Sequence, residues 1–84
     1  MVAWAGTATA VVLNVTAVQG TLPSFMTVWP ADVSQPLASN LNFTPGEDIP
    51  NLVTVKLSAS GQVKIYNNAG SVDVVADVVG WYAP

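Results

Sequence analysis

The stretch that decides the fold is Thr9-Ala10-Val11-Val12-Leu13-Asn14-Val15-Thr16-Ala17-Val18. An extended chain places every second side chain on the same face, so one face of this stretch is entirely aliphatic. That face consists of Val11, Leu13, Val15 and Ala17. The opposite face is mixed and consists of Val12, Asn14, Thr16 and Val18. Alternation with period two and many β-branched residues predict a strand that ends at Gln19-Gly20.

Five further runs of the same kind follow, separated by turn residues, and predict strands at residues 24–29, 38–44, 52–58, 62–67 and 72–82. Pro45-Gly46-Glu47-Asp48 is strong turn chemistry, and Ala59-Ser60-Gly61 is interpreted as a short hairpin connection. Apolar positions nowhere hold helical spacing over three turns, so no helix is expected. The chain, residues 1–84, is therefore predicted to be one all-β module, a small antiparallel β-sandwich of about six strands. A small barrel, or an oligomer completed by edge-strand pairing, is the alternative.

The first and last predicted strands share the pattern Val-Val-x-Asn/Asp-Val, at residues 11–15 and 74–78. Both are apolar even on the nominally outward face, as strands covered on both faces are. We therefore expect both to be central in a sheet, or to meet a neighbouring subunit. On a central strand Asp77 would be partly buried, and it would need a partner such as Lys64 or Asn14.

Composition excludes several classes of function. Only 8% of the 84 residues are charged and the net charge is -3, which leaves no basic face for a nucleic acid. The chain contains no cysteine and no histidine, so disulfides, zinc sites, haem ligation and histidine-assisted nucleophiles are excluded. No apolar run reaches the ~18–20 residues of a membrane-spanning helix. Apolar residues make up 51%, and this surplus predicts a homo-oligomer or one unit of an array.

The five acidic residues offer little for catalysis, and no enzyme activity or cofactor is expected. Asp73 and Asp77 lie four residues apart on one strand, on the order of 13 Å, which exceeds the ~5.5–9.5 Å separations of glycosidase carboxyl pairs. Asp48 with Asn51, or Asp32 with a loop carbonyl, could supply two or three calcium ligands. No Asp-x-Asp-x-Asp spacing accompanies them. Turn capping is the simpler interpretation, and no metal site is predicted.

Aromatic and amide side chains are the remaining candidates for a site. A flat ring can stack on the C–H face of a sugar, and amides can pair with hydroxyl groups without net charge. The candidate ligand-binding residues are Trp29, Asn40, Asn42, Tyr66, Asn67 and Trp81. They predict a lectin-like site for a neutral glycan, while packing in a core or an interface is the competing explanation for the aromatic residues.

Five segments together resemble a known repeat module. They are Ala10 to Ala17 (AVVLNVTA), Phe25 to Ala31 (FMTVWPA), Ala38 to Gly46 (ASNLNFTPG), Pro50 to Lys56 (PNLVTVK) and Val75 to Tyr82 (VADVVGWY). The chain resembles, over about residues 9–82, a module that occurs in tandem in secreted and cell-wall-associated proteins of actinobacteria. The resemblance implies an extracellular accessory module with tandem neighbours, and it assigns no role to any residue.

One difference from that module bears on assembly. Its repeats usually carry an additional N-terminal stretch with an Arg-Leu-Leu-Asp-Thr-Arg-like motif, where this chain has only residues 1–8. If that stretch supplies a strand, an apolar edge is left unpaired here, and such an edge invites another chain. The sequence therefore predicts a non-enzymatic extracellular module without membrane insertion, whose export signal lies outside residues 1–84. It binds neutral carbohydrate or, alternatively, is a self-assembling structural subunit.

Overall fold

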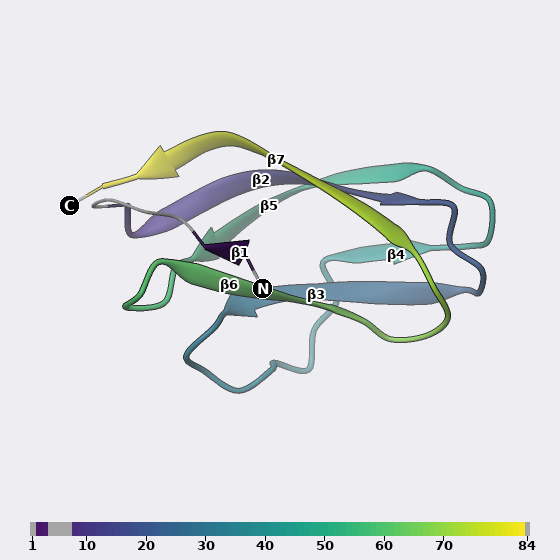
Figure 1. Ribbon diagram of the computed structural model, residues 1–84, viewed down its shortest axis with the longest axis horizontal. Helices are drawn as coiled ribbons and strands as arrows, with labels where there is room; N and C mark the ends of the chain where they lie inside the picture. The colour runs from purple at the N-terminus through teal and green to yellow at the C-terminus, as the bar shows by residue number, and fades with distance from the viewer. Residues whose placement is uncertain (1, 4–7, 84) are drawn as a thin grey trace.

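The computed structural model describes residues 2–3 and 8–83, and in these residues the chain forms strands and no helix. The strands are β1 (Val2–Ala3), β2 (Ala10–Val18), β3 (Ser24–Pro30), β4 (Leu41–Phe43), β5 (Ile49–Lys56), β6 (Gln62–Asn67) and β7 (Asp73–Tyr82). They build two sheets, with strand orders β1-β6-β3-β4 and β5-β2-β7. Every pair is antiparallel, and the sheets lie one above the other in Figure 1. The predicted small antiparallel β-sandwich is confirmed.

Strand β2 lies at the centre of the three-stranded sheet, paired with β5 on one side and β7 on the other. Its aliphatic face points into the sandwich as predicted, and Val15 and Ala17 are completely buried. The opposing sheet meets this face with Met26 and Val28 of β3. The other inward side chains of the core are Leu41, Phe43, Val53, Val55 and Val63. The period-two pattern therefore predicts the core correctly wherever a strand is covered by the other sheet.

Most connections carry the chain from one sheet to the other. The turns after β2, β4, β5 and β6 all cross the sandwich, and only the segment between β3 and β4 returns to the same sheet. The hairpin predicted at 59–61 is therefore wrong, because β5 and β6 belong to different sheets. The turn itself is tight, with a bond from the Gly61 amide to the Ser58 carbonyl, and Gly61 has φ +78°. Hairpins and such corners use the same turn residues, so composition does not distinguish them.

The strand predicted at 38–44 is shorter than expected, because β4 contains only Leu41–Phe43. The residues before it are held by other contacts. The Ala38 carbonyl accepts a hydrogen bond from the Thr27 hydroxyl (2.6 Å), and Asn40 bonds to β3 with its side chain. The segment 31–40 thus folds over the outer face of β3 instead of extending β4.

The sequence predicts that β7 is central in a sheet or meets a neighbouring subunit. The first of these alternatives is wrong, because β7 lies at an edge of its sheet. The shared pattern of residues 11–15 and 74–78 marks two strands that pair with each other, and only β2 of the two is central. Asp77 is exposed, so the partly buried carboxylate expected there is also wrong. It lies beside Asn14 in the ladder, one of the two neighbours expected for it.

Gly20, at the turn after β2, tests how tightly the turns are packed against the core. A Cβ atom at this buried glycine would lie 2.6 Å from the Phe43 ring. Gly20→Ala is therefore expected to lower the free energy of unfolding by about 1–3 kcal/mol, as overpacking does. Gly80→Ala is the matched control, because a Cβ atom there would meet nothing within 4 Å. Urea denaturation of both variants measures the difference, and equal stabilities would contradict the packing described.

Candidate functional site

The six candidate binding residues are not gathered in one groove. Trp29, Asn40 and Asn67 are held in structural contacts. Trp29 is only 8% exposed, and its indole Nε1 donates to the Val33 carbonyl at 3.1 Å. The ring therefore anchors the start of the 31–40 segment on the outer face of β3, and its N–H is already paired, as buried indoles require.

Asn40 makes hydrogen bonds to the edge of β3 where β4 no longer pairs with it. Strand β4 pairs with β3 only as far as Met26, which leaves the next amides on that edge of β3 without a strand partner. The Asn40 side chain accepts a hydrogen bond from the Val28 amide at 2.7 Å, and the Asn40 amide donates to the Met26 carbonyl at 2.8 Å. Asn40 thus satisfies part of the β3 edge beyond the last residue of β4.

Asn67 belongs to a network at the turn after β6. Its Oδ1 accepts a hydrogen bond from the Ser24 hydroxyl at 2.7 Å, and its Nδ2 donates to the Gly70 carbonyl at 3.0 Å. The Ser24 hydroxyl oxygen in turn accepts from the Ala69 amide at 2.9 Å. These bonds tie the start of β3 to the turn that leads into β7, and they occupy the Asn67 amide.

Asn42 and Tyr66 do share a surface, the outer face of the four-stranded sheet. Phe25 of β3 is the register partner of Asn42, and Thr27 is that of Tyr66, so all four side chains lie on one face. The Phe25 and Tyr66 rings meet edge to face, with centroids 6.4 Å apart and planes at 61°. Trp81 is far from this surface in the topology, since it is in β7 of the other sheet and shares the inner face with Val11.

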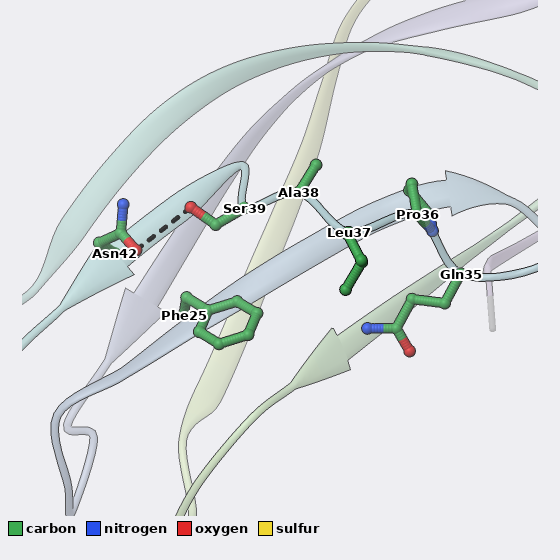
Figure 2. Close-up of a pocket in the computed structure, with 7 residues that line it drawn as sticks. All are labelled: Phe25, Gln35, Pro36, Leu37, Ala38, Ser39 and Asn42. Atoms are coloured by element: carbon green, nitrogen blue, oxygen red, sulfur yellow. Dashed lines mark hydrogen bonds between the residues drawn. The ribbon is translucent and has the colours of Figure 1, made fainter.

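A hollow of about 280 Å³ opens on this outer face. Figure 2 shows its lining residues, Phe25, Gln35, Pro36, Leu37, Ala38, Ser39 and Asn42. The Leu37 and Gln35 side chains extend toward the Phe25 ring from the 31–40 segment, and Asn42 borders the opposite side (Figure 2). The Ser39 hydroxyl donates to Asn42 Oδ1 at 3.2 Å. None of the lining residues is charged.

The wall of the hollow is held in place at several points along 31–40. The Val33 carbonyl is bonded to Trp29, the Ala38 carbonyl to Thr27, and the Asn40 side chain to Val28. All three partners are buried residues of β3. The lining segment 35–39 is thus hydrogen-bonded to β3 at and around both of its ends, while its own residues stay exposed to solvent.

Sequence reasoning misses Phe25, Gln35 and Leu37 as lining residues. The alternation of residues 24–29 places Phe25 on the face opposite Met26, but it does not indicate which of the two faces is the outer one. Gln35 and Leu37 precede β4 in an irregular segment, and the hydrogen bonds of that segment to β3, two of them long-range, bring them to the ring. Their position has no periodic signature in the sequence.

The acidic residues of the loops act as caps. Asp48 accepts a hydrogen bond from the Gln19 amide at 3.3 Å, and Asp32 accepts one from the Ala59 amide at 3.1 Å. Glu47 accepts bonds from the Thr44 hydroxyl and amide, and these bonds lower the pKa of the Glu47 carboxyl from its ordinary value. In the part of the chain that the structure describes, no three His, Cys, Asp or Glu residues form a group that could hold a metal ion.

Comparisons with protein-family models, with curated proteins and with solved structures each found no match to this chain. The resemblance to the actinobacterial repeat module therefore stays a prediction. Within residues 2–3 and 8–83, no helix is long and apolar enough to cross a membrane.

The free energy of unfolding distinguishes the role of Asn40 from that of Asn42. Asn40→Ala removes the acceptor of the Val28 amide and is expected to lower the free energy of unfolding by about 1–3 kcal/mol. Asn42→Ala changes an exposed residue of β4 and should stay within about 0.5 kcal/mol of the parent protein. Thermal and urea unfolding of the pair provide the measurement. Asn42→Ala being the more damaging change would overturn this assignment.

Proposed function

We propose that this chain is a non-enzymatic binding module that takes a neutral carbohydrate in the hollow on the outer face of the four-stranded sheet. The observation that carries the proposal is the composition of this hollow, which combines an aromatic ring, two amide side chains and a hydroxyl without any charged group. The extracellular setting rests on the resemblance of residues 9–82 to secreted and cell-wall-associated modules.

The chemistry of the lining fits a sugar. The Phe25 ring offers an apolar surface to the C–H face of a pyranose, and the edge contact with Tyr66 fixes the orientation of that ring. Gln35 and Asn42 carry amides that both donate and accept hydrogen bonds, as sugar hydroxyl groups require. Because no formal charge lines the hollow, an anionic or cationic sugar would gain nothing there to offset its desolvation.

The size of the hollow restricts the ligand to a small unit. Its volume of about 280 Å³ lies at the lower end of the ~300–1,000 Å³ typical of small-molecule sites. One or two sugar rings match this space. Since the hollow is open and offers few polar groups, we expect an affinity near 1 mM, about -4 kcal/mol.

Titration of the ¹⁵N-labelled chain with neutral mono- and disaccharides, followed by NMR, tests the proposal. Shifts should be confined to Phe25, residues 35–39 and Asn42. Gln35→Ala and Asn42→Ala should each weaken binding about 10-fold, the cost of roughly one lost hydrogen bond. Asn14→Ala is the matched control, because Asn14 lies on the other sheet.

Salt provides a second measurement on the same sample. With no charge in the hollow, affinity should change by less than about 2-fold when sodium chloride is raised to about 1 M, where charges are screened within ~3 Å. Absence of shifts with every neutral sugar at its solubility limit would refute the proposal. Equal weakening by Asn14→Ala and Asn42→Ala would refute the location of the site.

A further inference from the structure

Strand β7 is exposed at every residue except Gly80, which is half-buried. It pairs with β2, but among the described strands it makes no comparable contact with the opposite sheet. Its inward residues continue the core face of β2: Val74 is the register partner of Ala17, and Val78 that of Leu13. Ala17 and Leu13 are at most 2% exposed, whereas Val78 is 39% exposed. The apolar interior of the sandwich therefore opens to the surface along β7.

The other sheet edges are protected against further pairing, as edges in soluble proteins usually are. Strand β1 contains two residues and β4 three, which leaves little backbone for another strand. Strand β5 carries Pro50, which has no amide to donate, and ends at Lys56. Strand β7 has ten residues and contains neither proline nor lysine. The only protective features of β7 are two aspartates and a bulge at Val79, which has no register partner in β2.

We propose that β7 pairs antiparallel with β7 of a second copy of this chain, which joins two three-stranded sheets into one continuous six-stranded sheet. The exposed apolar residues of β7 are Val74, Val75, Val78, Val79, Trp81 and Tyr82. These side chains lie on both faces of the strand, so pairing at its edge covers only part of their exposed surface and gives an interface at the small end of the range, below about 1,200 Å². This surface is separate from the hollow around Phe25, and it stands independently of the carbohydrate proposal.

The positions of Asp73 and Asp77 distinguish the possible registers of the β7–β7 pair. A two-fold axis through Val75 would place Asp73 opposite Asp77, which like charges disfavour. A two-fold axis through Ala76 instead sets Val74 opposite Val78 on the inner face. It also places a valine opposite each aspartate. The Ala76 register therefore packs the inward valines against each other and leaves no aspartate directly opposite another, with Asp77 only a diagonal neighbour, about 7–8 Å away, of the aspartates of the second copy. The low net charge of -3 per chain opposes the pairing only weakly.

The oligomeric state of the whole chain tests the pairing. Sedimentation equilibrium across about 1–500 µM should give a monomer–dimer equilibrium with a dissociation constant in the micromolar range, as a weak pairing through a small interface does. Val78→Lys should weaken the dimer about 100-fold, because it buries a charge in an apolar contact. Val33→Lys is the matched control, since Val33 is also exposed but lies in the 31–40 segment. Circular dichroism confirms that both variants fold.

Crosslinking tests the register, and the natural absence of cysteine makes it unambiguous. Ala76→Cys places two thiols on the proposed axis, so mild oxidation should convert most of the protein into a disulfide-linked dimer. Ala59→Cys, at the turn between β5 and β6, should stay largely monomeric. A monomer at every concentration would overturn the proposal. So would a dimer that Val78→Lys and Val33→Lys weaken equally, or one that Ala59→Cys traps as well as Ala76→Cys.

Discussion

The structure depends on the burial of one face of β2. This strand is paired along both edges, and its inward side chains lie between the two sheets at 2% exposure or less. Full burial of a side chain such as Leu13 or Val15 contributes about 1.5–3 kcal/mol, which is large for a domain of 84 residues without disulfides. A shift of the β2 register by one residue would replace this aliphatic face with one that contains Asn14 and Thr16. The alternation of residues 9–18 therefore specifies the register of the whole three-stranded sheet.

The turns that cross between the sheets hold the two sheets together as a sandwich. Because most connections pass from one sheet to the other, the two sheets cannot separate without opening these turns. Polar contacts hold the turns in place. The Ser24 hydroxyl and Asn67 join the start of β3 to the end of β6, and the Thr21 amide bonds to the Ser71 carbonyl at 3.0 Å. Asn67 is used at one of these turns and Asn40 at the open edge of β3, which explains why these two candidate asparagines are structural.

The fold was predictable from the sequence to the extent that it follows local patterning. Period-two alternation identifies the core residues of β2, β4 and β5, and turn residues separate the strands. Strand partners were not predictable, because the turn at 59–61 has the same residues in a hairpin and in a corner between sheets. The edge position of β7 was not predictable for a related reason. A strand has the same apolar sequence pattern whether it is covered within its own chain or by a neighbouring one.

The candidate site was predictable only in part. Asn42 and Tyr66 were recognised from their residue types, and the structure places both on the outer face beside Phe25. The hollow itself depends on the return of residues 31–40 across β3, which is fixed by hydrogen bonds to Thr27, Val28 and Trp29. The bonds of Thr27 and Val28 join groups 11 and 12 residues apart in the sequence, and no local pattern encodes them.

Native-state hydrogen exchange, measured residue by residue at low protein concentration, tests the central role of β2 most directly. The β2 amides are expected to exchange only through global unfolding and to show the highest free energy of opening in the chain. The amides of β3 and β6 should open at an equal or lower free energy. If the β2 amides exchange at a lower free energy than those of the β3–β6 pair, β2 is not the strand on which the fold depends.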